Sequence, residues 1–176
     1  MPAADWEAES AIILPVPEAE ALVQPIRAEG DALTALGVPA HITILYPFAP
    51  PTQISQDDLV RLARLFFERT PFRFQLANVA SFPDAVYLTV EPQEAFRELT
   101  ALVVEAYPQY LPYGGRHPDS TPHLTIHTAS SEALTTELKS RFEGHLPIEG
   151  YAKEAWLMEK RPDDRWAFRA AFPFGS

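Results

Sequence analysis

The chain has 176 residues, enough for one substantial hydrophobic core and too few for two independent domains of average size. Hydrophobic residues make up 47% of it and charged residues 22%, the balance of an ordinary protein that folds alone. The absence of cysteine excludes disulfides, thiolate metal sites and a cysteine nucleophile. The sequence contains no run of about 18 apolar residues, so it predicts no membrane span. We expect a cytoplasmic protein that does not bind membranes, and we expect it to be a monomer.

The formal net charge of -10 argues against a partner such as long duplex nucleic acid, because that binding needs cations that neutralise phosphates. The charge is unevenly distributed. Residues 1–60 hold a single cation, Arg27, among nine acids, whereas the remaining 116 residues hold 13 cations and 15 acids. The second part is nearly neutral and can carry a local basic rim. A nucleotide or a short RNA with a phosphorylated end is therefore the more plausible ligand.

The first predicted elements are a strand, a helix and a second strand. Residues 10–16 form an aliphatic run between prolines that is typical of a strand. Residues 18–36 favour a helix, in which Pro25 either occupies the first helical position or kinks a longer helix. Gly37 suits the end of that helix. A strand over residues 41–46 follows.

The rest of the chain continues the alternation of helices and strands. Its predicted elements are a helix over 55–69 capped by Ser55, strands over 72–82 and 85–91, a helix over 93–107, a loop over 108–122, a strand over 123–128, a helix over 131–142, and a closing hairpin of 148–159 with 166–172. This order reads as one unit used twice. We therefore predict an α+β fold over residues 1–176, a duplicated bilobal domain whose two antiparallel sheets face a central cleft with helices packed outside.

A four-residue pattern occurs twice in this series, each time within a predicted strand. Residues 41–44 are His-Ile-Thr-Ile, and residues 123–126 are His-Leu-Thr-Ile. Because side chains alternate along a strand, His and Thr of each copy share one face. Two such strands facing each other supply two imidazoles, which can exchange protons near pH 7, and two hydroxyls, which can hydrogen-bond phosphate oxygens. The alternative without a function is a pair of half-buried histidines whose ring nitrogens hydrogen-bond backbone groups.

These motifs and their surroundings resemble the 2H phosphoesterase superfamily, and within it the bacterial proteins of the 2′-5′ RNA ligase family. The segments that carry the resemblance are residues 37–48, 112–115 and 122–126, Trp166, and residues 172–175. It implies a bilobal α+β fold and chemistry without metal or cofactor on 2′,3′-cyclic or 2′-5′-linked phosphodiesters. The positions that match the catalytic motifs are His41, Thr43, His123 and Thr125. The resemblance favours His123 as base and His41 as acid.

Further residues are candidates for substrate binding. Tyr113 lies in the loop before the second motif and can stack on a base. His127 lies two residues past Thr125, on the same strand face, and can extend the polar groove. The motif strands contain no Arg or Lys, so any cationic side chain that contacts the phosphate has to come from a loop. The candidates are Arg116, Lys160, Arg161 and Arg165. Arg27 is placed to pair with Asp31 at i, i+4.

The sequence predicts a metal-independent phosphodiesterase that opens a 2′,3′-cyclic phosphate on a nucleotide or RNA end. One imidazole takes a proton from water and the other gives one to the departing ribose oxygen. An alternative is a module that binds the same ligand in the same groove without turnover. A metallohydrolase that uses His41, His123 and His127 is a third class, but the sequence has no metal-ligand spacing such as H-E-x-x-H.

Overall fold

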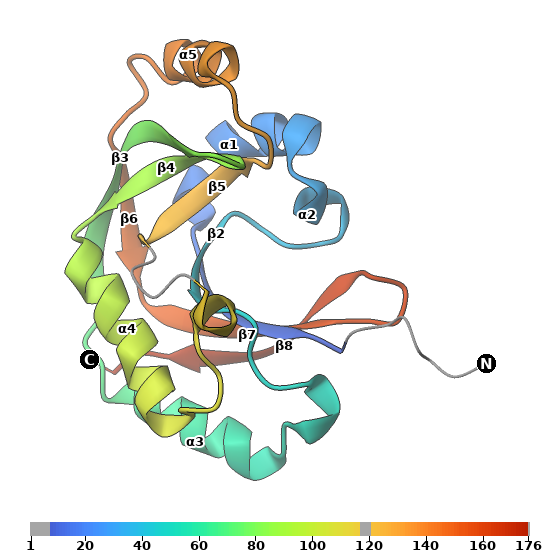
Figure 1. Cartoon of the computed structure of the whole chain (residues 1–176). Helices are drawn as coiled ribbons and strands as arrows, with labels where there is room; N and C mark the ends of the chain where they lie inside the picture. The colour runs from blue at the N-terminus through green and yellow to red at the C-terminus, as the bar shows by residue number, and fades with distance from the viewer. Residues whose placement is uncertain (1–7, 117–120, 176) are drawn as a thin grey trace.

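A computed structural model describes residues 8–116 and 121–175, which fold into two sheets and the helices around them (Figure 1). The strands are β1 (Ser10–Pro15), β2 (His41–Leu45), β3 (Phe72–Phe82), β4 (Ala85–Glu91), β5 (His123–His127), β6 (Ile148–Ala152), β7 (Glu154–Lys160) and β8 (Trp166–Pro173). The helices are α1 (Pro17–Gly30), α2 (Ala32–Ala35), α3 (Gln56–Phe67), α4 (Gln93–Ala106) and α5 (Glu132–Arg141), with 3-10 turns η1 (Pro51–Gln53) and η2 (Pro112–Gly115). None of the helices in the described part is long and apolar enough to cross a bilayer.

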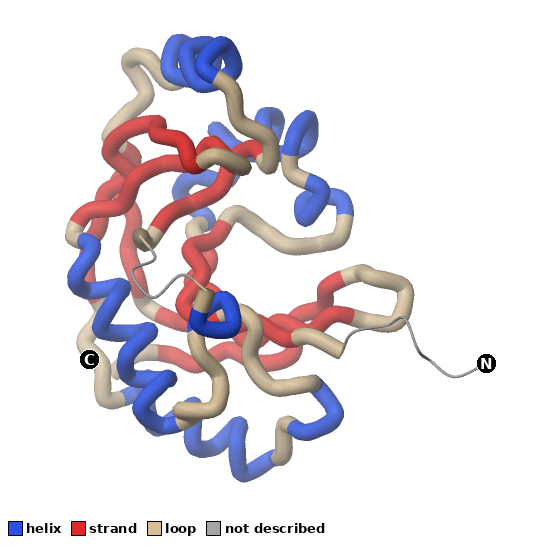
Figure 2. Tube along the Cα trace, in the orientation of Figure 1, coloured by secondary structure: helices blue, strands red, loops and turns tan. Residues whose placement is uncertain are grey.

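Both sheets have four strands and are antiparallel throughout. The first sheet has the order β2-β1-β7-β8, and the second sheet has the order β5-β4-β3-β6. Figure 2 shows the helices around the strands of both sheets. The predicted α+β fold with two antiparallel sheets is confirmed.

The two sheets are not built from consecutive halves of the chain. The first sheet joins β1 and β2 from the beginning of the chain to β7 and β8 from its end, while β3 to β6 form the second sheet. The chain therefore leaves the first sheet after β2 and returns to it only at β7. This interleaving ties the two sheets together, because the first sheet is completed only by strands that follow the whole second sheet along the chain.

The single strand predicted over residues 148–159 is wrong. It is two strands, β6 and β7, separated at Lys153. Before that residue, β6 pairs with β3 in the second sheet, and after it β7 pairs with β1 and β8 in the first. The apolar pattern continues across the break, so the sequence does not show that the chain passes from one sheet to the other. In β6 a side chain at Gly150 would meet Phe74, since an added Cβ would lie 2.2 Å from the ring.

The single helix predicted over residues 18–36 is also divided. Asp31 has extended backbone angles between α1 and α2, and its carboxylate accepts a hydrogen bond from the Leu33 N–H at the start of α2. Pro25 lies inside α1, and Pro17 instead occupies the first helical position. Gly37 follows α2 with φ of +95°, a left-handed conformation that glycine adopts without a steric penalty.

The buried core joins the apolar faces of both sheets. Ile42 and Ile44 of β2 belong to the same buried cluster as Leu124 and Ile126 of β5. Under the first sheet, α3 contributes Phe66, whose ring stacks on aromatic rings of the chain's last residues. Because side chains alternate along a strand, burying these aliphatic residues turns the His and Thr residues of both motifs to the opposite face.

Replacing Phe66 with alanine should lower the free energy of unfolding by about 3–5 kcal/mol, the usual cost of emptying a fully buried phenylalanine site. The neighbouring Phe67 is a matched control because its side chain is 67% exposed, and Phe67→Ala should change stability by less than about 0.5 kcal/mol. Urea denaturation of both variants measures the difference. Equal losses in the two variants would contradict the packing of α3 described above.

Candidate active site

The two motif strands are edge strands of different sheets, and they lie next to each other. β2 ends the first sheet and β5 ends the second, and the two strands contact each other (Figure 1). Their burial alternates in the same way: the aliphatic residues are buried, whereas His41, Thr43, His123 and Thr125 are half-buried. The structure therefore brings both motifs together, on strands that belong to separate sheets.

Both histidine rings are held by the same local hydrogen bond. His41 Nδ1 lies 2.8 Å from the carbonyl oxygen of Pro39, and His123 Nδ1 lies 2.7 Å from that of Thr121. A carbonyl oxygen only accepts, so Nδ1 carries the hydrogen in both rings. In the neutral ring Nε2 then has the free lone pair. Each histidine thus presents the nitrogen that can accept a proton, or donate one once the ring is protonated.

Tyr113 contacts the first motif directly. Its hydroxyl hydrogen-bonds the hydroxyl of Thr43, and its backbone N–H donates to the carbonyl of Tyr46 just after β2. The Tyr113 backbone has φ of +52°, which is uncommon for a residue other than glycine. Burial raises the pKa of the Tyr113 hydroxyl. The structure thus brings a predicted substrate-binding residue to a predicted catalytic one.

The two imidazoles have unequal electrostatic surroundings. Burial lowers the pKa of His41 from 6.5 to about 4, and the positive charge of Arg27 and a smaller effect of His123 act in the same direction. The hydrogen bond to Pro39 and the charge of Asp31 oppose the shift. Burial also lowers the pKa of His123. Both rings are therefore neutral at pH 7 in the free protein, with His41 the harder of the two to protonate.

The neighbours of the second histidine are aromatic. The ring of Phe82 lies 5.1 Å from that of His123 and the ring of Tyr87 lies 5.4 Å away, both edge-on. The Phe82 and Tyr87 rings stack on each other at 4.2 Å. These two rings displace water from one side of His123, which explains why burial dominates the pKa shift of this residue.

The other predicted binding residues are placed less directly. Arg116 is exposed at the end of η2, and its backbone N–H donates to Tyr113. The His127 ring lies against Gly30 at the end of α1, where an added Cβ would come within 1.9 Å of it. Lys160 pairs with Glu9 and Asp164, and Arg161 pairs with Glu159. Arg165 is exposed.

Sequence reasoning did not find the groups that surround the two rings. The Arg27–Asp31 pair was predicted from its spacing, and the structure confirms it with 3.0 Å between Arg27 Nε and the carboxylate, but the sequence does not place it beside His41. The sequence feature that singles out Arg27 is that it is the one cation among nine acids in residues 1–60. The sequence does not single out Phe82 and Tyr87 as neighbours of His123, because aromatic residues are common in β-hairpins.

A pocket of about 320 Å³ opens beside Thr43, between β2, α4 and the loop that carries Tyr113. Its walls are mostly apolar, with Phe96 and Val104 of α4 among them, and Arg97 supplies a positive charge. Pro122, next to His123, also lines it. The pocket therefore borders the first motif, reaches the residue before the second, and has the volume of a small-ligand site.

No three His, Asp or Glu side chains within residues 8–116 and 121–175 lie close enough together to form a metal site. The polar groups that the two motif strands and Tyr113 supply are instead two imidazoles, two threonine hydroxyls and the Tyr113 hydroxyl. Such a set can move protons and donate hydrogen bonds to an anion.

Comparison with known families agrees with this geometry. The family profile described as the 2′-5′ RNA ligase superfamily matches residues 15–164, most of the chain. The protein therefore belongs to this superfamily, which is the 2H phosphoesterase superfamily that its motifs resemble. No curated protein sequence matches the chain.

Solved structures show the same fold at low sequence identity. Escherichia coli LigT complexed with 3′-AMP is 15% identical with a TM-score of 0.62, covering 96% of this chain and 99% of its own. TT0787 of Thermus thermophilus is 17% identical with a TM-score of 0.56, covering 94% and 97%. A structure described as a phosphoesterase is 13% identical with a TM-score of 0.60, covering 97% and 100%. These likenesses establish the fold over nearly the full length of the chain.

The low pKa of His41 predicts a specific pH dependence of stability. Between pH 6.5 and 4 the unfolded chain binds a proton at this residue and the folded protein does not, so stability falls as pH falls through that window. From pH 7 to pH 5 the contribution is about 2 kcal/mol, at 1.36 kcal/mol per pKa unit.

The comparison that isolates this contribution is urea denaturation of wild type and His41→Gln at both pH values. The wild type should lose about 2 kcal/mol more than the variant between pH 7 and pH 5. His145→Gln, at an exposed position, should behave as wild type. Parallel losses in wild type and His41→Gln would show that the folded protein protonates His41 normally.

Proposed function

We propose that this protein is a metal-independent phosphodiesterase that opens 2′,3′-cyclic phosphates on nucleotides or short RNA ends. The observation that carries the proposal is the pair of imidazoles on adjacent edge strands, each with Nδ1 bonded to a carbonyl so that Nε2 is available for proton transfer. Membership of the 2′-5′ RNA ligase superfamily supports the reaction class. The absence of a cofactor and a cytoplasmic location remain predictions of the sequence.

The reaction needs one proton removed and one delivered. Water attacks phosphorus as the neutral imidazole takes its proton, a new P–O bond forms, and the bond from phosphorus to one ribose oxygen breaks. The protonated imidazole gives its proton to that oxygen, leaving a phosphomonoester and a free ribose hydroxyl. The stronger depression of the pKa of His41 favours this residue as base and His123 as acid, the reverse of the assignment that the family resemblance favours.

Two hydroxyls complete the proposed site. Thr43 and Thr125 each share a strand face with their histidine, so they can donate hydrogen bonds to the non-bridging phosphate oxygens and stabilise the charge that develops there. Thr43 already hydrogen-bonds Tyr113, so its hydroxyl has to exchange that partner for the phosphate when a substrate binds. In this proposal the phosphate lies between the two strands.

The pocket beside Thr43 is the proposed place for the nucleoside. Its apolar wall on α4 suits a base, and the charge of Arg97 suits a nearby phosphate or a carbonyl group. The solved structure of LigT with 3′-AMP shows that a protein of this fold binds a nucleotide. A nucleotide or RNA end is therefore the ligand class we propose here.

One observation favours the alternative, a module that binds the same ligand without turnover. Burial keeps both imidazoles neutral at pH 7, so the free protein lacks a protonated acid. An enzyme needs the anionic phosphate to raise one of the two pKa values on binding, whereas a binding module does not. Turnover separates the two functions.

The decisive assay offers 2′,3′-cyclic nucleotides, RNA with a cyclic phosphate end and 2′-5′ dinucleotides to the purified protein in EDTA, and resolves 2′- from 3′-phosphate products. His41→Ala and His123→Ala should each lower kcat by about 10²–10⁴-fold, the contribution of one acid or base. The double variant should lose little more, because the two groups act as one unit. His145→Ala is the control. Binding without any turnover would establish the module instead.

The pH profile tests the division of roles. The base has to be neutral, above the pKa of His41 at about 4, and the acid has to be protonated, below a His123 pKa that is itself under 6.5. The value of kcat/KM should therefore give a bell whose optimum lies between about pH 4 and 6.5, with apparent pKa values that belong to the coupled pair.

Threonine variants supply the control for this profile. Thr43→Val and Thr125→Val should each lower the rate by up to about 10²–10³-fold and leave the bell in place, since they remove a hydrogen-bond donor and no titrating group. Initial rates against pH for wild type and both variants, with EDTA throughout, make the measurement. A flat profile, or activity that EDTA abolishes and zinc or manganese restores, would rule out the two-histidine mechanism.

A further inference from the structure

A fully buried ion pair lies beside the first motif and is not used by the proposed chemistry. The side chains of Arg27 and Asp31 are each 1% exposed, with 3.0 Å between Arg27 Nε and the carboxylate. A buried pair of this kind contributes little net stability, because removing two charges from water costs about as much as their attraction returns. In addition, Arg27 Nη1 is buried and has no hydrogen-bond partner within the described residues. Stability alone therefore gives no reason for the pair.

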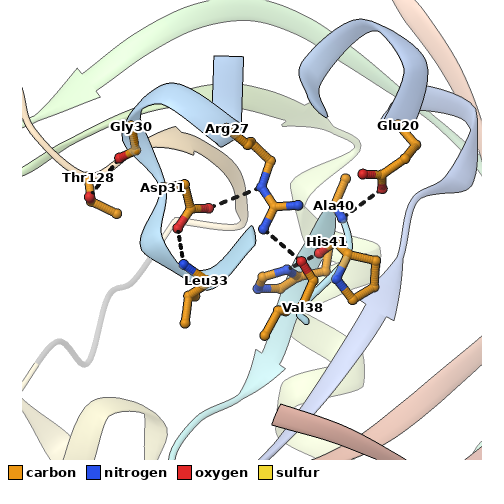
Figure 3. Close-up of polar contacts among 10 residues, drawn as sticks. Glu20, Arg27, Gly30, Asp31, Leu33, Val38, Ala40, His41 and Thr128 are labelled. Atoms are coloured by element: carbon orange, nitrogen blue, oxygen red, sulfur yellow. Dashed lines mark hydrogen bonds and ion pairs between the residues drawn. The ribbon is translucent and has the colours of Figure 1, made fainter. Parts of the chain in front are cut away.

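The pair is connected to the backbone that leads into His41 (Figure 3). Arg27 Nη2 donates to the carbonyl of Val38 at 3.0 Å. The next carbonyl, that of Pro39, accepts from His41 Nδ1 at 2.8 Å. The Ala40 N–H donates to Glu20 at 2.9 Å, and Glu20 lies on α1 with Arg27. Each residue of segment 38–40 thus makes at least one polar contact, and the Val38 N–H and the Ala40 carbonyl also bond the backbone of Leu33 and Val16.

The other end of the pair is equally constrained. The Asp31 carboxylate accepts from both Arg27 Nε and the Leu33 N–H, so it holds the guanidinium while it caps α2. The carbonyl of Gly30, the residue before it, accepts from the backbone N–H and the hydroxyl of Thr128, just after β5 (Figure 3). The pair is therefore anchored to the strand that carries the second motif as well as to α1.

His123 has no such support in the described structure. Its ring makes the same bond to the carbonyl two residues earlier, the rings of Phe82 and Tyr87 lie against it, and the one charged group that acts on it is Asp84, which raises its pKa and forms no buried pair in the described structure. The two motifs are alike in sequence and in strand position and differ in this buried pair. The difference points to a specific requirement at His41.

We propose that Arg27, locked by Asp31, is a positioning residue for His41, which it orients by fixing the carbonyl of Val38 and with it the segment that leads into β2. The charged groups that act on the His41 ring are Arg27 and Asp31 from the α1 side and His123 from β5, while Glu20 binds the adjacent Ala40 N–H. Arg27 lowers the pKa of His41 and Asp31 raises it, so the two members of the pair act on the ring in opposite directions.

Because Arg27 and Asp31 act on the pKa of His41 in opposite directions, variants of these two residues test the positioning role. Only the rate measurement in this test rests on the proposed function. The titration of both histidines is followed by NMR on the free protein without substrate. Arg27→Met should raise the titration midpoint of His41, and Asp31→Asn should lower it, while His123 stays unchanged in both. Asp31→Asn keeps Arg27 and an oxygen that can still accept from the Leu33 N–H. A purely structural role of the pair would not move His41 in opposite directions.

The rate measurement uses the substrate on which the wild type is most active. Arg27→Met should lower kcat by about 10²-fold and change KM little, the effect of displacing a catalytic group without removing it. Arg69→Met, which breaks an exposed pair with Glu98, is the matched control and should leave both kcat and the titrations unchanged.

The outcomes separate this inference from the proposed function. A wild type without turnover defeats the proposed function, and the titrations still decide whether the pair acts on His41. If Arg27→Met does not fold, Asp31→Asn is sufficient for the test, because it should lower the titration midpoint of His41. Unchanged His41 titration, or shifts of the same sign in Arg27→Met and Asp31→Asn, would overturn the positioning role.

Discussion

Each motif histidine donates a hydrogen bond from Nδ1 to the carbonyl oxygen two residues earlier, and the chemistry proposed for this site depends on that bond. It fixes the tautomer and the orientation of the ring together, because a carbonyl can only accept. Without it, an imidazole on a half-buried strand face could present either nitrogen to the cleft. The bond needs only three consecutive residues with the right backbone, so the same solution occurs at both motifs.

The arrangement of the sheets turns these two local solutions into one site. β2 and β5 are both edge strands, and burying their aliphatic side chains in a shared core leaves the His and Thr residues on the opposite face. The interleaved chain, with β1, β2, β7 and β8 in one sheet, brings the two edge strands into contact. Within this near symmetry the surroundings differ, with a buried ion pair beside His41 and aromatic rings beside His123. Two equivalent histidines can in this way take unequal roles.

The sequence predicted the fold class, most elements and both motifs, because burial of a strand face and helix capping leave regular local patterns. Ser55, for example, caps α3 as its spacing indicated. The break at Lys153 escaped prediction because a strand that changes sheets keeps its apolar pattern. At Asp31 the carboxylate caps α2, and the place of the Arg27–Asp31 pair beside His41 depends on tertiary structure. The i, i+4 spacing predicted the pair itself, but a local pattern does not encode that the pair is buried or which catalytic candidate lies beside it.

The central claim is that both imidazoles bind one phosphate, and NMR titration of the histidine side chains with 3′-AMP tests it most directly. The account predicts that the Nε2 resonances of His41 and His123 shift together, with one dissociation constant and one nucleotide per protein, and that His145 does not respond. A response of only one of the two rings, or two different dissociation constants, would contradict a shared phosphate site.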